Sequence, residues 1–220
     1  MATDPLKLCM LSGSFEYDSE RSLRRLETYL ASRFDVETTL IVYRDEDDDP
    51  SLAPIDETDV LLVFTRRLNT SGPELERFQA YCAAGRPIVG IRTASHGFQN
   101  WLAFDKEVLG GNYDGHYGGG PLCQVSVAPG AERHPVLRDV LSFTSEGSLY
   151  KNTPIADDAT LLLVGRTADG EEPVAWIRRH RGGRVFYTSL GHQSDFLNPN
   201  FLRLIENAVL WAGGRLDSTV

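Results

Sequence analysis

Cysteine, positive charge and long apolar runs are all scarce in this sequence, and each scarcity excludes a class of protein. The 220 residues include three cysteines, Cys9, Cys82 and Cys123. An odd count without a CxxC pair argues against a disulfide framework and against a structural zinc site. Lysine and arginine total 22 against 31 acidic residues, the net charge is −9, and residues 45–49 are all acidic. We therefore expect neither a nucleic acid nor an anionic membrane as partner, because both need clustered basic residues.

Targeting and nucleotide-binding signals are also missing. No apolar run approaches the roughly 18 residues that a membrane helix needs. The first residues open onto a strand without a charged and then apolar leader, so we expect a reducing, cytoplasmic setting. The turn 12–14, Ser-Gly-Ser, is neither a phosphate-binding loop nor a dinucleotide fingerprint, which disfavours ATP and NAD.

Strands and helices alternate in the first half of the chain. Apolar segments at 6–11, 36–43, 60–64 and 87–91 read as strands, and amphipathic helices are expected over 19–34 and from Ser71. Ser71, Pro73 and Glu74 have the spacing of a helix start closed by a capping box. Strand, helix, strand at this spacing favours parallel pairing with right-handed crossovers.

The second half is more irregular. Residues 98–120 are rich in glycine and aromatics and resemble a lid or an insertion. Short strands follow at 124–127, 160–164, 173–178 and 184–189, the last two joined by a hairpin at 181–184. A final helix opens at Asn198-Pro199 and ends at Gly213-Gly214. We expect a single α/β domain over residues 1–220, a flavodoxin-like, doubly wound, mainly parallel sheet flanked by helices, with an additional β hairpin region.

The turn after the strand 87–91 is the most informative position in the sequence. Many α/β hydrolases and amidotransferases place a serine or cysteine nucleophile there. Here it holds Arg92, which is always protonated and cannot act as a nucleophile. Ser95 lies nearby, but residues 93–97 lack the first glycine of a G-x-S-x-G motif. The chemistry is therefore not expected to be acyl transfer through a cysteine.

Three histidines stand beside glycines in loops: His96, His116 and His192. Such residues could form an acid/base pair with an orienting group, or hold a metal ion. None has HxH or HxxxH spacing, so the signal for zinc is weak. The alternative that each histidine only bonds a loop backbone stays open.

Several further side chains are candidates for contacts with a ligand. Arg92 suits a carboxylate, a phosphate or a polyhydroxylated ligand, but could equally pair with Asp114, Glu146 or Asp195. Arg66 admits the same two interpretations. The aromatic rings of the glycine-rich segment could stack on a sugar or anchor their own loop; these rings are Trp101, Tyr113 and Tyr117. Asn198 is either a helix cap or a site residue.

Several sequence blocks together resemble the trehalose-utilisation ThuA-like family, which has the class I glutamine-amidotransferase-like fold. These blocks are residues 87–96, 109–116, 173–176, 183–192, 198–199 and 207–212. The resemblance spans nearly the whole chain, and its C-terminal block is the most specific part.

The resemblance implies a link to disaccharide metabolism through 3-keto-sugar intermediates. His116 matches the family's Gly-Gly…Gly-His motif and His192 its terminal Gly-His. Arg92 occupies a position where the family often has histidine and amidotransferases have cysteine. Gly147 and Ser148 stand where many members show Asp-Glu. These departures argue against amidotransferase activity and against a metal site that uses the missing carboxylate.

Two hypotheses follow. In the first, the protein acts on a sugar or a 3-keto-glycoside, with His96, His116 and His192 as acid/base residues. The ligand would then be bound by Arg66, Arg92, Ser95, Tyr113, Asp114 and Asn198. In the second, the protein is a non-catalytic sugar-binding or interaction module. The expected partner is a small-molecule sugar; a divalent metal such as zinc is the candidate cofactor, and a homo-oligomer the candidate assembly.

Overall fold

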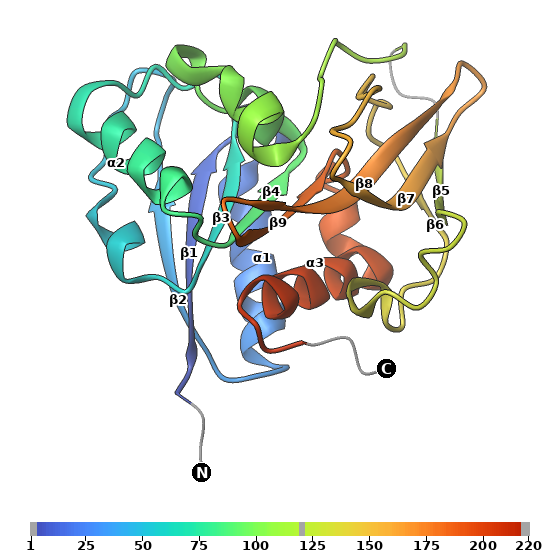
Figure 1. Ribbon diagram of the computed structural model, residues 1–220, viewed down its shortest axis with the longest axis horizontal. Coiled ribbons are helices and arrows are strands. Elements are labelled where there is room, and N and C mark those ends of the chain that lie inside the picture. Colours follow the sequence, from blue (N-terminus) through green and yellow to red (C-terminus); the bar gives the residue numbers. More distant parts are fainter. Residues whose placement is uncertain (1–3, 119–121, 217–220) are drawn as a thin grey trace.

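A nine-stranded sheet runs through the described part of the computed structural model, which comprises residues 4–118 and 122–216 (Figure 1). The strand order is β2-β1-β3-β4-β9-β8-β7-β5-β6. The strands are β1 (Leu6–Gly13), β2 (Val36–Val42), β3 (Val60–Thr65), β4 (Ile88–Ile91), β5 (Cys123–Val127), β6 (Phe143–Ser145), β7 (Thr160–Arg166), β8 (Glu171–His180) and β9 (Gly183–Thr188).

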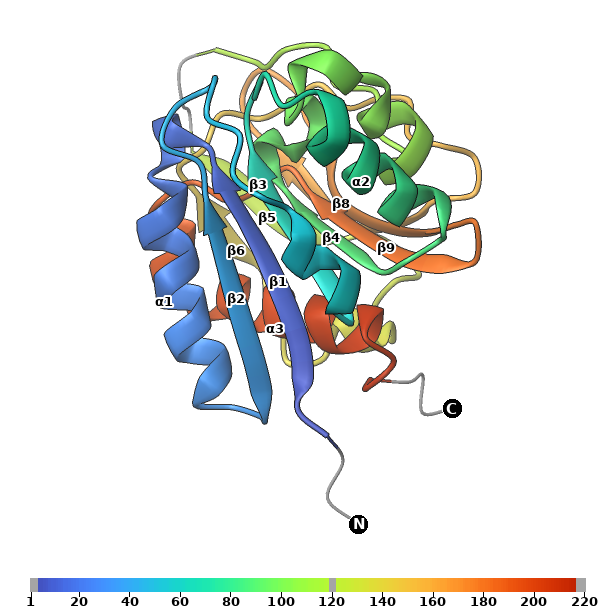
Figure 2. The same ribbon diagram turned by 90° about the vertical axis from the view of Figure 1, so that its left-hand side faces the viewer.

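The first five strands in this order, β2 to β9, pair in parallel. Every residue of β3 and β4 is buried, because helices cover both faces of this half of the sheet. The helices are α1 (Ser19–Ala31), α2 (Gly72–Ala83) and α3 (Pro199–Ala212). Helices α1 and α3 share a hydrophobic core on one face, and α2 packs in a second core on the other. Figure 2 shows α1 and α2 on opposite sides of β1 and β2. The predicted doubly wound α/β fold is confirmed.

The remaining strands continue the sheet in antiparallel fashion, from β9 through β8, β7 and β5 to β6. The predicted hairpin is present between β8 and β9, with Arg181 and Gly182 at positive φ angles of 50° and 89°. The prediction missed β6, because three residues are too few to show a period-2 pattern.

The two predicted helix starts differ in outcome. Asn198 caps α3 as expected, since its side-chain oxygen accepts a hydrogen bond from the backbone N–H of Asn200 at 2.9 Å. Ser71 precedes α2 but forms no side-chain capping bond, so the predicted capping box is wrong. The Glu74 carboxylate instead accepts from the backbone N–H of Leu52 at 2.6 Å, which ties α2 to the preceding loop.

The glycine-rich segment after β4 is more ordered than expected. It contains 3₁₀ turns at Arg92–His96 and Gln99–Trp101 and a single π-helical turn at Asp105–Leu109. Trp101 packs edge-on against Phe78 at 5.7 Å between ring centroids and lies 5.4 Å from Phe104. Trp101 therefore anchors the segment to α2, as the second interpretation of these rings proposed. Within the described residues, no helix is both long and apolar enough to cross a membrane.

Helix α3 supplies a direct test of this core. Leu204 is fully buried, so Leu204→Ala removes methyl groups from a packed site and should lower the free energy of unfolding by about 2 to 5 kcal/mol. Leu197→Ala, at a side chain that is 65% exposed just before the helix, is the matched control and should cost far less. Urea unfolding measures both, and equal losses would contradict the assignment of Leu204 to the core.

Candidate functional site

Arg92 lies at the turn where β4 ends, with a positive φ of 48°. Non-glycine residues seldom adopt this conformation, which makes the turn comparable to a nucleophile elbow. The side chain does not reach solvent, being only 1% exposed. Its guanidinium carbon lies over the rings of Tyr17 and Tyr150, at 4.4 and 4.6 Å from the two ring centroids. Two cation–π contacts thus stabilise the buried group.

Hydrogen bonds fix the edge of the same guanidinium. Nη1 donates to the carbonyl of Ser189 at 2.8 Å and Nη2 donates to the Tyr17 hydroxyl at 3.0 Å, whereas Nε has no partner. In the described part of the chain, Arg92 forms no ion pair with Asp114, Glu146 or Asp195. Asp195 is close enough to affect Arg92 electrostatically, but its Oδ2 accepts hydrogen bonds from Ser145, Gly191 and His192. The expected alternative of a direct ion pair is therefore wrong, and in this conformation the guanidinium offers a ligand no free face.

Gly147 lies directly against this buried cation. A Cβ atom built on Gly147 would be 2.7 Å from Nη1 of Arg92. Since Arg92 is buried, hydrogen-bonded and packed against two aromatic rings, it has little room to move away. A residue larger than glycine at 147 is therefore incompatible with Arg92 in this position.

A cavity of about 330 Å³ opens beyond the carboxyl ends of β3 and β4. In open α/β sheets, ligands collect at this edge. Four of the predicted site residues line the cavity: Ser95, His96, Tyr113 and Asp114. The other lining residues are Arg67, Leu102, Asp105 and Gly115.

His96 is the best-positioned histidine of the cavity. Its ring stacks on Tyr113 at 4.4 Å between centroids, and Nδ1 lies 3.0 Å from the Ser95 hydroxyl. Burial, with a contribution from the positive charges of Arg67, Arg66 and Arg92, lowers the pKa of His96 to about 3. His96 is therefore neutral at pH 7, and can accept or donate a hydrogen bond but cannot act as an imidazolium acid.

The other two predicted histidines lie outside the cavity lining. His116 is exposed, with Nδ1 3.2 Å from the carbonyl of Gly118 and its ring 6.5 Å from that of Tyr150. His192 is half-buried, with Nδ1 2.8 Å from the Ser194 hydroxyl and its ring 6.2 Å from that of Tyr17. The structure thus distributes the histidines around the stacked Tyr17, Arg92 and Tyr150.

This arrangement bears on the candidate zinc ion. In residues 4–118 and 122–216, no three His, Cys, Asp or Glu side chains are grouped so that they could hold a metal ion. The three histidines therefore do not fit a shared metal centre.

The remaining predicted binding residues have structural partners. Arg66 pairs with Glu16, with 3.1 Å between Nε and Oε2. Asn198 is occupied as the cap of α3. Tyr117 donates through its hydroxyl to Glu172 at 3.2 Å. None of these three lines the cavity.

Among the cavity residues that sequence reasoning missed, Asp105 is the buried acidic one. Its Oδ2 accepts a hydrogen bond from the backbone N–H of Tyr113 at 2.8 Å, whereas Oδ1 is buried without a partner. Burial raises the pKa of this carboxyl group to about 6. A signal was available: Phe104, Asp105, Val108 and Leu109 recur at helical spacing, which would have placed Asp105 on the buried face.

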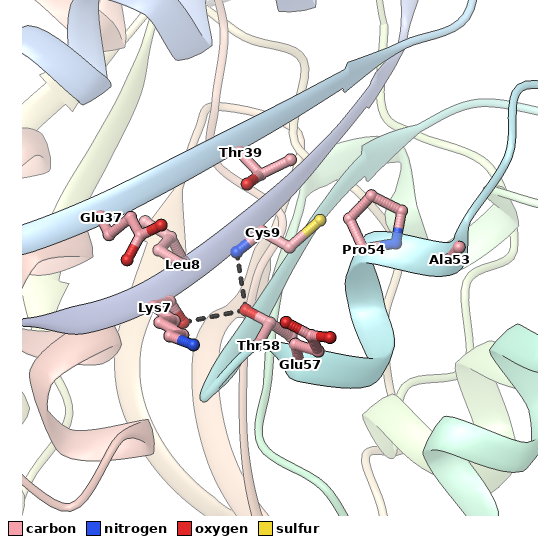
Figure 3. Close-up of a pocket in the computed structure, with 9 residues that line it drawn as sticks. All are labelled: Lys7, Leu8, Cys9, Glu37, Thr39, Ala53, Pro54, Glu57 and Thr58. Carbon is pink, nitrogen blue, oxygen red and sulfur yellow. Dashed lines mark hydrogen bonds between the residues drawn. The ribbon is translucent and has the colours of Figure 1, made fainter.

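A second cavity, of about 360 Å³, lies near the amino end of β1 (Figure 3). It is bordered by Lys7, Glu37 and Glu57, and the Thr58 hydroxyl accepts from the backbone N–H of Cys9 at 2.9 Å. Burial raises the pKa of the Cys9 thiol to about 12, so this sulfur is not a thiolate at neutral pH. The cavity contains none of the predicted residues and lies away from the carboxyl edge, so we place the candidate site in the first cavity.

The contact between Gly147 and Arg92 predicts a coupled pair. Gly147→Ala should lower the free energy of unfolding by about 1 to 3 kcal/mol, because the alanine methyl group would overlap the Arg92 side chain, which its packing prevents from shifting. The same change made in an Arg92→Ala background should cost much less. A double-mutant cycle from urea unfolding measures this coupling, and additive effects would contradict the contact.

The two perturbed groups of the cavity predict opposite pH effects on stability. In the unfolded chain His96 becomes protonated below about pH 6.5, whereas in the folded protein it stays neutral down to about pH 3. Protonation therefore favours the unfolded state, and this group lowers the free energy of unfolding as the pH falls. Asp105 keeps its proton in the folded protein up to about pH 6 but loses it near 3.8 when unfolded, so it lowers stability as the pH rises.

Removing either group should therefore change the slope of stability against pH. Between pH 4 and 6, Asp105→Asn should make stability rise more steeply with pH than in the wild type, and His96→Gln should do the reverse. Urea unfolding at several pH values gives these slopes. Unchanged slopes in both variants would contradict the two perturbed pKa values.

Comparison with known proteins agrees with this fold. A solved ThuA-like protein from Parabacteroides merdae is 16% identical, with a TM-score of 0.78 over 99% of this chain and 93% of that one. A ThuA-like protein from Bacteroides uniformis is 19% identical, with a TM-score of 0.73 over 96% and 93% of the two chains. A glutamine amidotransferase from Thermotoga maritima is 10% identical, with a TM-score of 0.60 over 96% and 99%.

At these identities the solved structures show likeness of fold alone. None of the curated proteins matches the chain. The family assignment rests instead on a family model, described as trehalose utilisation, that matches residues 12–212. The matched range begins near the end of β1 and includes β2 to β9, helices α1 to α3 and the residues that line the cavity. This protein belongs to the ThuA family.

Proposed function

We propose that this protein acts on a sugar or a 3-keto-glycoside by acid/base chemistry, without a cysteine nucleophile. The observation that carries the proposal is the cavity at the carboxyl ends of β3 and β4, where His96 stacks on Tyr113 beside Ser95. Membership of a family described as trehalose utilisation supports a carbohydrate as ligand.

The size and lining of the cavity suit a sugar unit. A volume of about 330 Å³ lies at the lower end of the range of small-molecule sites. Tyr113 offers an aromatic surface for the C–H face of a sugar ring, and the Ser95 hydroxyl and the Asp114 carboxylate offer hydrogen bonds to sugar hydroxyls. Arg67 adds a positive charge to the lining.

A keto-sugar gives these residues a reaction to perform. Proton removal from the carbon beside a ketone needs a base and a hydrogen-bond donor for the oxygen on which charge develops. A neutral His96 can supply that donor, since a neutral imidazole keeps one N–H. His116 and His192 lie outside the lining, and their acid/base roles remain part of the proposal to be tested by substitution.

Glutamine amidotransfer is disfavoured by the positions of the thiols. The elbow residue is Arg92, and all three cysteines are buried elsewhere. Burial raises the pKa of Cys9 to about 12 and that of Cys123 to about 11, which leaves both sulfurs protonated.

One observation favours a second candidate function, a non-catalytic sugar-binding module. The elbow position, where related scaffolds expose a reactive group, is filled here by a guanidinium that is enclosed by Tyr17 and Tyr150. A protein that had lost its reactive group and kept its cavity would bind a sugar without altering it. A cytoplasmic setting, a homo-oligomeric assembly and the lack of nucleic-acid or membrane partners remain predictions from the sequence.

Incubation of the purified protein with trehalose and with 3-keto-glycosides tests the proposal, with products read by chromatography and mass spectrometry. We expect conversion of at least one substrate, unaffected by chelator, and a loss of about 100-fold or more in His96→Ala. His180→Asn is a matched control, because His180 ends β8 at the hairpin, away from the cavity.

The outcomes separate the two candidate functions. A rise in melting temperature with a sugar that is recovered unchanged would favour the binding module. Neither conversion nor a thermal shift with any of these sugars would contradict both. Loss of conversion on chelation would contradict the metal-free chemistry proposed here.

A further inference from the structure

Asp105 is a buried carboxyl group in the cavity that the predicted histidine arrangement does not include. We propose that Asp105 is a catalytic residue of this site, the base that removes the proton from the carbon beside the ketone of a bound keto-sugar. This inference rests on the proposed function and names the proton acceptor that the function requires.

The local backbone holds Asp105 in place. It opens the π-helical turn Asp105–Leu109, and its carbonyl accepts hydrogen bonds from the N–H groups of Gly110 at 2.7 Å and Gly111 at 3.1 Å. The chain then turns back so that the N–H of Tyr113 reaches Oδ2 at 2.8 Å. Single π turns are frequent at functional sites, where they redirect a side chain. The loop thus fixes the carboxyl group and the ring that stacks on His96 in one unit.

The second oxygen of the carboxyl group has been left without a partner. Oδ1 is buried and receives no hydrogen bond from the residues that the structure describes. A Cβ atom on residue 111 would lie 2.3 Å from it, so the glycine at 111 provides the room that Oδ1 occupies. Burial of a polar atom without a hydrogen-bond partner is unfavourable. A ligand that brings a proton to Oδ1 would supply the missing partner.

The surroundings of Asp105 tune it for proton transfer near neutral pH. Burial raises its pKa to about 6, and the hydrogen bond from Tyr113 opposes that rise. The titratable or charged groups around it are His96 after β4, Arg67 after β3, Tyr113 and Asp114 on its own loop, and Tyr187 on β9. His96 is neutral and Tyr187 has its pKa raised well above its usual value, so neither adds charge beside the carboxyl group at pH 7. A base whose pKa lies just below the working pH is mostly ionised and still accepts a proton readily.

The proposed step transfers one proton and changes no oxidation state. The C–H bond beside the ketone breaks, and its proton forms an O–H bond with the Asp105 carboxylate. The electron pair left on carbon forms a C=C bond, and the carbonyl pair moves to oxygen, where a hydrogen bond from neutral His96 stabilises the enolate. Return of a proton from the carboxyl group to carbon restores the ketone. In D₂O the carboxyl proton exchanges with solvent, so the carbon acquires deuterium.

This exchange gives the test. Wild-type protein, Asp105→Asn and the control Asp157→Asn are incubated with a 3-keto-glucoside in D₂O, and deuterium uptake is followed by NMR against a protein-free sample. Asp157 is exposed and outside the cavity lining. In Asp105→Asn the amide oxygen can still accept the N–H of Tyr113, so the loop should persist. We expect exchange to fall by about 100-fold or more in Asp105→Asn, and to be unchanged in Asp157→Asn.

Two further measurements distinguish catalysis from a structural role. The wild-type rate should rise with pH through about 6, as the carboxyl group ionises, and the residual rate of Asp105→Asn should lack that rise. The thermal shift caused by the keto-sugar should be retained in Asp105→Asn, showing that the variant folds and binds.

The failures are distinguishable. Exchange by the wild type that persists in Asp105→Asn would overturn the role of Asp105 and leave the proposed function standing. Loss of the thermal shift together with exchange would overturn catalysis by Asp105 in favour of a role in holding the loop. No exchange or conversion by the wild type would overturn the proposed function, and with it this inference.

Discussion

The enclosure of one cation, Arg92, constrains the centre of the molecule more than any other contact. Its guanidinium binds a ring from the loop after β1, a ring from the strand-like segment before the cis Thr153-Pro154 bond, and a carbonyl at the end of β9. Three separate parts of the chain thus meet on a group for which the sequence left two interpretations open, a ligand contact or a structural ion pair. A buried charge without a directly paired carboxylate is tolerated because aromatic faces and oriented oxygens replace its water.

Tyr150 connects this constraint to the candidate site. Tyr150 touches Arg92 on one face and approaches the rings of Tyr113 and His96 at 4.6 and 6.1 Å between centroids. Tyr150 therefore links the buried cation to two of the side chains that line the cavity.

The sequence predicts best those structural elements whose residue patterns extend over many positions. Long amphipathic helices and buried parallel strands were located to within a few residues, and the hairpin at Arg181 and Gly182 followed from its glycines. The partner of Arg92 could not be predicted, because cation–π contacts join residues 75 and 58 positions apart without any periodic pattern. Asp105 was missed because residues 105–107 are all charged and so resemble an exposed turn. Only the helical spacing of the buried residues around Asp105 indicates that it lies on a buried face.

The state of the two perturbed groups has a consequence for what the cavity admits. Of the two buried titratable groups of the cavity lining, His96 is uncharged at neutral pH and Asp105 becomes an anion once the pH passes about 6. Arg67, being exposed, has its charge weakened by solvent. A phosphorylated or acidic sugar would have to place its negative charge next to a carboxylate in a region of low dielectric, whereas an uncharged glycoside would not. Above about pH 6, Asp105 therefore opposes the entry of any anionic group into the cavity, and the positive charge of Arg67 at the rim offsets only part of that repulsion.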